Sequence, residues 1–434
     1  MGVRDRPDPS QGALRLVLEI SRAITERSLA GATDLELVGW VCERVVAAGV
    51  PLCRMLIGVD TLHPLVGGRV FTWRRGEGVS LSEYALEDSQ PEAEPWVNSP
   101  FFLLLSGAGE SPYRHRMAGG PYPYPILAEL AEVGVTDYIA CVHRLGEAVR
   151  MGQFDCVYSS WGTDAADGFT EEAVALIDAI GPFVAAALVT ETTRQIARTL
   201  VATYLGADAG ERVLRGAIAR GVAEPIRAVV WLSDLRGFTR MVDELGAAVV
   251  LPLLNDYADP QVAAIHAHGG TVLKFMGDGL LAIFPVGEGA AEAGRRALAA
   301  ATAALAAIAE VSARRAAAGL PVTGAYLALH VGEVFYGNIG GKERLDFTVI
   351  GAAVNEAARM SSLCGALGQD ILVSEAFAAA TPELRRCLVA LGRHTLRGVA
   401  QAQALFGVPV TRGAAGEEAA AMTSGSWFGR GDDG

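Results

Sequence analysis

From residue 226 onward, runs that read as strands alternate with runs that read as helices. The segment IRAVVWLSDLRGFT is an apolar strand that ends in Asp234 and is followed by a glycine turn. Residues 270–285, GTVLKFMGDGLLAIFP, contain two apolar runs around Gly277-Asp278-Gly279, a pattern typical of a β-hairpin. This order predicts an α+β domain in which neighbouring strands bring Asp234 and Asp278 together.

Two carboxylates at one edge of a sheet repel each other unless a cation lies between them. The pair Asp234 and Asp278 is therefore a natural Mg²⁺ or Mn²⁺ site. Aspartate is also a common turn residue, and spacing alone leaves that simpler interpretation open. After Asp234, the turn at Gly237 leads into a helix predicted over 240–267. Backbone N–H groups at such a helix start can cradle phosphate, and Thr239 adds a hydroxyl.

A second pair of polar residues lies in the segment VNEAARM, which reads as a short helix. Asn355 and Arg359 are four residues apart and therefore share one helix face. An amide beside a guanidinium can hold two oxygens of one substrate. Taken alone, the pair is better explained as an exposed Asn and a surface-paired Arg.

The motifs WLSDLRGFT, KFMGDGLLAIFP, HVGEVFYGNIGGKERLDFTVIG and VNEAARM resemble, in order and spacing, the catalytic domain of class III nucleotidyl cyclases. The resemblance covers 223–410. It implies a ferredoxin-like βαββαβ fold that works as a homodimer, with sites shared between two chains and the loop 337–347 reaching towards the partner. It also implies two metal ions per site, Mg²⁺ or Mn²⁺, bound by Asp234, Asp278 and the backbone carbonyl of Leu235.

The resemblance also implies how the substrate is bound. The purine would be read by Lys274 and Thr348, the ribose oriented by Asn355, and the transition state stabilised by Arg359. The phosphates would lie on the turn formed by Gly237, Phe238 and Thr239.

Base choice follows from hydrogen-bond chemistry. A Lys ammonium donates to N1 of adenine and a Thr hydroxyl accepts from N6, whereas guanine presents N1–H to the cation, which is a mismatch. The pair Lys274 and Thr348 therefore favours ATP, and the expected function is adenylate cyclase, converting ATP to 3′,5′-cyclic AMP and pyrophosphate. The alternatives are a guanylate or relaxed-specificity cyclase and a catalytically silent nucleotide-binding module.

Some positions depart from the family pattern. Ala352 stands where the family often has Asp, and no Lys occurs near the C-terminal strand, where Arg397 is the nearest candidate cation. His330, in LALHVGEV, is predicted to be a core or turn histidine rather than a ligand.

The first half of the chain reads as helix, strands, an irregular middle over 86–124, strands and a final helix that starts near Phe169. This order resembles a GAF-type sensor domain over 13–190, which would bind a small ligand or a partner and regulate the cyclase. A plain dimerising domain is the alternative. Residues 191–222 are predicted to be a helical transmission linker, and 1–12 and 411–434 to be tails. The apolar spacing of five residues would suit a paired helix in a dimer: Val189, Thr193, Ile196, Leu200 and Tyr204.

The composition limits which binding partners and which cellular compartment are expected. The 434 residues contain 49 acidic and 36 basic side chains, a net charge of −13, which disfavours nucleic-acid binding. The six cysteines form no CxxC pair and predict reduced thiols in the cytoplasm. The N-terminal residues do not resemble a signal peptide. The most apolar stretches, 173–189 and 297–309, are shorter than the about 20 residues that a membrane span needs.

Overall fold

The computed structural model describes residues 11–86, 94–109, 111–117, 119–287, 289–397 and 401–409. The chain divides into two compact units between Leu200 and Val201, inside the predicted linker 191–222. The predicted tail 411–434 lies outside the described residues, as does the tail 1–12 apart from its last two residues, which begin the first helix.

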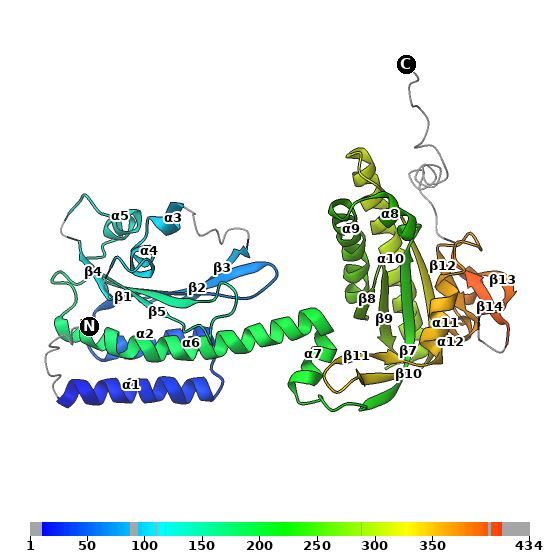
Figure 1. The fold of residues 1–434 in the computed structure, drawn as a ribbon. Coiled ribbons are helices and arrows are strands. Elements are labelled where there is room, and N and C mark those ends of the chain that lie inside the picture. Colours follow the sequence, from blue (N-terminus) through cyan, green and yellow to red (C-terminus); the bar gives the residue numbers. More distant parts are fainter. Residues whose placement is uncertain are drawn as a thin grey trace, which may run out of the picture. The chain divides into compact units, whose positions relative to one another are not determined.

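The first unit is a six-stranded antiparallel sheet with helices on both faces (Figure 1). Its strand order is β3-β2-β1-β6-β5-β4. The strands are β1 (Leu52–Asp60), β2 (Val66–Arg74), β3 (Gly78–Ala85), β4 (Tyr113–Arg116), β5 (Asp137–Arg144) and β6 (Cys156–Thr163). One face packs against α1 (Gln11–Leu29), α2 (Asp34–Ala47) and α6 (Glu171–Leu205). The other carries α3 (Glu94–Val97), α4 (Pro100–Leu105) and α5 (Pro125–Glu132).

This unit has the element order that the sequence predicts, with three additions. Strand β3 and helix α5 were not anticipated, and β4 lies inside the stretch 86–124, which reads as loop. The predicted helix start near Phe169 agrees with α6, which begins at Glu171. The structure thus contains a domain of helices and sheet, and its assignment to the GAF family remains a prediction.

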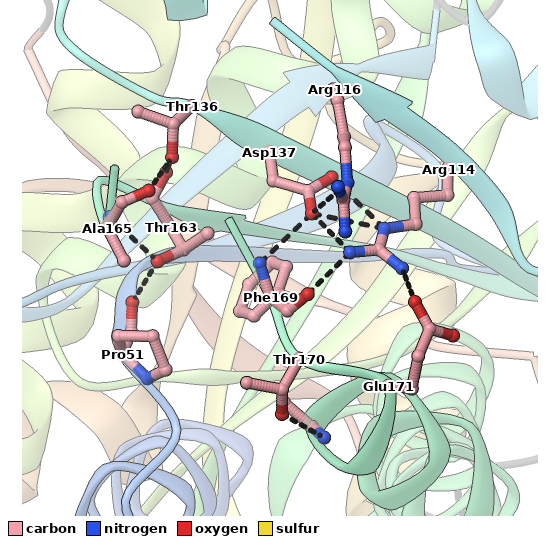
Figure 2. Close-up of polar contacts among 11 residues, drawn as sticks. Pro51, Arg114, Arg116, Thr136, Asp137, Thr163, Ala165, Phe169, Thr170 and Glu171 are labelled. Carbon is pink, nitrogen blue, oxygen red and sulfur yellow. Dashed lines mark hydrogen bonds and ion pairs between the residues drawn. The ribbon is translucent and has the colours of Figure 1, made fainter. Parts of the chain in front are cut away.

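A buried ion-pair network fastens the start of α6 to this sheet (Figure 2). Asp137 is fully buried and accepts hydrogen bonds from Arg114 Nη2 at 2.7 Å and from the backbone N–H of Phe169 at 3.0 Å. Arg114 also donates from Nη1 to Glu171, in the first turn of α6, at 2.7 Å. The guanidinium of Arg114 therefore joins β4, β5 and α6 through two carboxylates.

Helix α6 does not present the face that its apolar spacing predicts. Ile196 is buried in the core of the first unit, and Val189 and Leu200 pack against that core. The interpretation of these three residues as a partner-facing stripe is wrong, because their own domain already covers them. Thr193 and Tyr204, the other two residues of the spacing, are exposed.

The second unit is built on a mixed sheet of order β13-β14-β12-β10-β7-β9-β8, with β11 paired to β10. Its strands are β7 (Ala223–Leu235), β8 (Thr271–Met276), β9 (Gly279–Pro285), β10 (Ala325–Gly340), β11 (Leu345–Ile350), β12 (Ile371–Ser374), β13 (Val389–His394) and β14 (Gln403–Gly407). Its helices are α7 (Ala207–Leu214), α8 (Phe238–Glu244), α9 (Ala247–Ala267), α10 (Ala290–Ala317), α11 (Ala352–Ser361) and α12 (Glu375–Ala380).

Strand alternation assigns the two faces of this sheet. On β7, Val229 and Trp231 pack with α9 and α10, whereas Val230 and Leu232 pack with α11. Because side chains alternate along a strand, Asp234 belongs to the α11 face. This α+β architecture agrees with the predicted fold class for the catalytic half.

One local expectation changes in detail. The helix predicted over 240–267 is divided into α8 and α9 by Leu245 and Gly246. The predicted loop 337–347 has the hairpin form that its sequence indicates, because β10 extends to Gly340, β11 starts at Leu345 and the two strands are paired.

Two helices of the described chain, α6 and α10, are long and apolar enough to cross a membrane by length and composition alone. The buried share of the most apolar window is 50% in α6 and 44% in α10. Each helix packs one face on its own sheet, which is how core helices also behave.

Candidate active site

Asp234 and Asp278 meet at one end of the second sheet, as predicted. Asp234 is the penultimate residue of β7, and the register pairs Ser233 of β7 with Leu280 of β9. Asp278 lies in the two-residue turn between β8 and β9, next to Gly277, whose φ of +69° needs glycine. The hairpin turn is therefore held beside the end of the central strand.

Gly279 permits this approach. A Cβ atom at Gly279 would lie 2.9 Å from the backbone oxygen of Ser233, closer than a side-chain carbon tolerates. The same atom would lie 3.6 Å from Oδ1 of Asp234. The missing side chain lets β9 lie against the end of β7, and this contact determines where the two carboxyl groups meet.

The electrostatics of the pair agree with this geometry. Partial withdrawal from water, a hydrogen bond to the Asp278 carboxyl and the charge of Asp278 raise the pKa of Asp234 to about 7. The backbone N–H of Leu235 donates to the Asp234 carboxyl and opposes this rise. Two carboxyl groups in hydrogen-bond contact offer a pair of hard oxygen donors, which are the ligands that a divalent cation prefers.

The turn after Leu235 has the predicted form. Gly237 adopts a left-handed φ of +63° and caps α8, which starts at Phe238. Phe238 packs against the core on the α9 and α10 face, whereas Thr239 is exposed. The role of these residues in phosphate binding stays a prediction.

The two predicted purine-reading residues are brought together by β8 and β11. Lys274 Nζ on β8 forms an ion pair with Asp346 Oδ2 on β11 at 2.8 Å. Thr348 is two residues beyond Asp346 and therefore on the same side of β11. Its side chain is 4% exposed, and its Oγ1 has no hydrogen-bond partner within the described chain. This buried hydroxyl has no partner among the described residues and lies two residues along the strand from the carboxylate that holds Lys274, so it is a polar group that can receive a ligand.

Asn355 and Arg359 share the outer face of α11, as their spacing predicts. The inner face is formed by Ala353, Ala357 and Met360, which are buried against the sheet. Within the described ranges, no hydrogen bond or ion pair links Asn355 or Arg359 to Asp234 or Asp278. A single chain therefore supplies the two halves of the predicted site without joining them.

Three further outcomes concern individual residues. His330 is buried, and burial lowers its pKa to about 4, which confirms a core histidine. Arg397 is exposed and makes no ion pair with a described residue. Asp346 was not among the predicted site residues. Its position two residues before Thr348 on the same strand could have indicated it, because both side chains then lie on one side of the strand.

Known proteins resemble the second unit. The sequence model of the adenylate and guanylate cyclase catalytic domain matches residues 223–406. An uncharacterized protein of Mycobacterium tuberculosis is 34% identical over 209 residues, which are 48% of this chain and 36% of that protein. An uncharacterized protein of Mycobacterium bovis is 34% identical over 206 residues, covering 47% of this chain and 37% of that protein. The chain thus spans little more than a third of the length of these curated relatives.

Two solved cyclases also align. The adenylyl cyclase CyaB from P. aeruginosa is 26% identical, with a TM-score of 0.40, over 44% of this chain and 97% of that one. The guanylyl cyclase Cya2 is 29% identical, with a TM-score of 0.38, over 43% of this chain and 93% of that one. The match of the family model falls on the strands that carry Asp234, Lys274 and Thr348 and on the helix that carries Arg359. Residues 223–406 are therefore a catalytic domain of the class III adenylate and guanylate cyclase family.

Proposed function

We propose that the protein is an adenylate cyclase, which converts ATP to 3′,5′-cyclic AMP and pyrophosphate at sites shared by two copies of the chain. The observation that carries the choice of ATP is the ion pair of Lys274 with Asp346, which lies two residues before Thr348 on the same side of β11. Both specificities occur among the similar structures, adenylyl for CyaB and guanylyl for Cya2, so the choice of base rests on these residues.

The hydrogen-bond pattern supports adenine. The ammonium of Lys274 is held by Asp346 at 2.8 Å and can donate to adenine N1. The unpartnered hydroxyl of Thr348 can accept from the N6 amino group. The Thr348 hydroxyl could donate to guanine O6, but guanine would place its N1–H against the lysine cation, where two donors face each other. A buried polar group left unpaired in this way costs binding energy, so the site disfavours GTP.

The carboxyl pair fits divalent metal. A cation would be held by Asp234, Asp278 and the carbonyl of Leu235, and the two carboxyl groups, which are hydrogen-bonded to each other, offer the hard oxygen donors that such a cation prefers. Bound Mg²⁺ or Mn²⁺ would supply Lewis acidity for the ribose 3′-hydroxyl and would offset charge on the leaving pyrophosphate.

The protein's own groups position the remaining parts. In the reaction, the ribose 3′-oxygen forms a bond to the α-phosphorus, and the bond from that phosphorus to the bridging oxygen breaks. Asn355 would hold the ribose, and Arg359 would stabilise negative charge that develops on the α-phosphoryl oxygens. Lys274 and Thr348 would fix the base and so align the 3′-oxygen with phosphorus.

The shared site is supported by where α11 presents its polar residues. Asn355 and Arg359 lie on the face of α11 that its own sheet does not cover. The strands β8, β10 and β11 also expose large apolar side chains, which a second copy would cover. These are Phe275, Met276, Phe335 and Ile350, which are 57%, 41%, 52% and 48% exposed.

The test is cyclic-nucleotide production by the full-length protein, with ATP and GTP offered separately in Mg²⁺ and in Mn²⁺. We expect cyclic AMP from ATP, and loss of activity in Asp234→Ala and in Arg359→Ala. Mixing these two variants should restore about a quarter of the wild-type activity, because half of the dimers are mixed and each has one intact site. A mixture of Asp234→Ala with Asp278→Ala is the matched control and should stay inactive, because both changes damage the same half-site.

Other outcomes would replace the proposal. Preferential turnover of GTP would make the protein a guanylate cyclase, and nucleotide binding without turnover would make it a silent module. The double variant Lys274→Glu with Thr348→Cys should shift kcat/KM towards GTP by about tenfold or more. An unchanged preference would mean that these two residues do not read the base.

We also propose that the first unit regulates the cyclase. The proposal is supported by α6, which begins in the first unit at Glu171 and continues past the boundary at Leu200.

A further inference from the structure

Arg236 follows the carboxyl-bearing end of β7 and lies close to the predicted site. Its backbone N–H donates to the oxygen of Gly324 at 2.9 Å, which continues the pairing of β7 with β10 by one residue. Asp234 and Arg236 are two residues apart, so alternation places both side chains on the α11 face. The residue paired with Asp234 on β10 is Tyr326.

Arg236 is held by three neighbouring residues, two of which contact its guanidinium and one its backbone oxygen. Its carbon Cζ lies 4.8 Å from the centre of the Tyr326 ring, a cation–π distance. It forms an ion pair with Asp370, at the start of β12. The backbone oxygen of Arg236 accepts a hydrogen bond from Thr323 Oγ1 at 2.8 Å. The Tyr326 ring covers one side of the guanidinium plane, and the contacts with Asp370 and Thr323 hold Arg236 in place.

The same side chain is still available to a ligand. It is 28% exposed, and its Nε is buried without a hydrogen-bond partner in the described ranges. Arginine has five N–H donors in a planar fork that matches phosphate oxygens. A guanidinium that is preorganised on an aromatic ring loses little conformational entropy when it binds an anion.

The charge of the substrate requires such a group. A nucleoside triphosphate carries about four negative charges near neutral pH, and the carboxylates of Asp234 and Asp278 repel it unless cations offset the charge. Lys274 is paired with Asp346 and is assigned to the base. Arg359 lies on the outer face of α11. Arg236 is the cation that the chain places directly after the metal-binding strand end.

We propose that Arg236 binds the terminal phosphates of the nucleoside triphosphate, with Tyr326 as its platform and Asp370 as the counter-ion that the phosphates displace. This inference rests on the proposed function in that it assigns the triphosphate to this site. It makes Arg236 a substrate-binding residue for which the sequence motifs provided no role.

The experiment measures binding without turnover. The full-length protein is titrated calorimetrically with an ATP analogue that has a methylene group between the α- and β-phosphorus, and separately with AMP, both in Mn²⁺. The variant Arg236→Gln keeps a side chain that can reach Tyr326 and donate to Asp370, but it loses the charge and the fork. We expect its Kd for the triphosphate analogue to rise by about 10- to 100-fold, while its Kd for AMP changes by less than about twofold.

Two further variants make the result specific. Arg236→Lys keeps the charge without the fork and should give an intermediate Kd for the triphosphate. Arg240→Ala is the matched control, because Arg240 is an exposed cation on α8 that pairs with Glu244 at 2.9 Å. It should bind both nucleotides as the unmodified protein does.

Equal weakening of triphosphate and AMP binding in Arg236→Gln would overturn the inference, because it would indicate a merely structural role. Unchanged triphosphate binding would overturn it as well. If the unmodified protein makes no cyclic nucleotide but binds the triphosphate in an Arg236-dependent way, the proposed function fails and this inference stands. Failure of the unmodified protein to bind the triphosphate analogue would overturn both.

Discussion

At the scale of single residues, the site is dominated by two acids, Asp234 and Asp278, whose carboxyl groups are hydrogen-bonded to each other. Asp234 has a pKa of about 7 because it is partly withdrawn from water and faces Asp278. In the absence of a cation, that contact is a local cost to the folded state, since both groups would be ionised and separate in the unfolded chain. A bound cation would remove this repulsion, so the contact that destabilises the metal-free protein would also favour metal binding.

Replacing Asp278 by Asn should therefore have opposite effects with and without metal. In EDTA at pH 8, Asp278→Asn removes a like charge and should raise the Tm by about 2 °C. Millimolar Mn²⁺ should raise the Tm of the unmodified protein but not that of the variant, because ligand binding stabilises the state that binds. Thermal unfolding in the two buffers measures both effects.

Asp243→Asn, on the exposed side of α8, is the control for charge and should respond to Mn²⁺ as the unmodified protein does. A lower Tm of Asp278→Asn in EDTA would mean that the two carboxyl groups support each other, and the metal site would then be in doubt.

His330 gives the second unit a predictable sensitivity to acid. Burial lowers its pKa from the ordinary 6.5 to about 4, and Glu356 Oε2 lies 3.8 Å from its Nε2. Between these two pH values the unfolded chain binds the proton and the folded chain does not. The stabilising contribution is thus complete above pH 6.5 and is lost as the pH falls towards 4.

The unfolding free energy of the protein should fall by up to about 3 kcal/mol over this interval on account of His330 alone. His330→Gln cannot titrate and should show a correspondingly flatter dependence. Urea unfolding, followed by the fluorescence of the buried Trp231, measures the difference between the two slopes. Parallel slopes would show that another group accounts for the acid sensitivity.

At the scale of elements, the hairpin of β8 and β9 locates the site, and Gly279 is its critical contact. Gly279→Ala places a methyl carbon 2.9 Å from the oxygen of Ser233, so β9 must move away from the end of β7. We expect a loss of about 1–3 kcal/mol of stability and weaker Mn²⁺ binding, because the carboxyl groups separate. Urea unfolding and Mn²⁺ titration test the two effects.

Gly246→Ala is the matched control for the loss of a glycine. Gly246 has a φ of −68°, and a Cβ there meets nothing within 4 Å. If Gly279→Ala binds Mn²⁺ as tightly as Gly246→Ala does, the close approach of β9 is not what fixes the carboxyl pair.

Sequence could predict the strands and turns that carry the motifs because their apolar runs are long and their turn residues are glycine and aspartate. It missed β3 and β4, which are the two edge strands of the first sheet and carry polar or exposed residues at most positions. An edge strand buries little, so its sequence shows no apolar run. The contact of Lys274 with Asp346 joins residues 72 apart, and only the fold brings them together.

At the scale of the whole molecule, α6 is the element common to the two halves, and the network in Figure 2 fixes its first turn. Arg114→Met would leave the fully buried Asp137 with the Phe169 N–H and with Arg116, whose Nε lies 3.8 Å away. Removing one partner of a buried pair costs about 3–5 kcal/mol. Urea unfolding of the full chain should show this loss. If the first unit regulates the cyclase through α6, the rate of cyclic-nucleotide production should change as well.

Arg116→Met is the control, because the Arg116 side chain is 60% exposed and meets the same carboxylate at longer range. It should cost less than about 1 kcal/mol. Equal destabilisation by the two variants would show that Arg114 has no special place in the network.

The outward face of α11 has a consequence for how such a protein responds to its own abundance. If the site is shared by two chains, as proposed, a chain that is alone has no complete site. At concentrations below the dimer Kd, output then rises with the square of the number of chains, and doubling synthesis gives about four times the product. Expression level would set a threshold for signalling before any ligand is sensed.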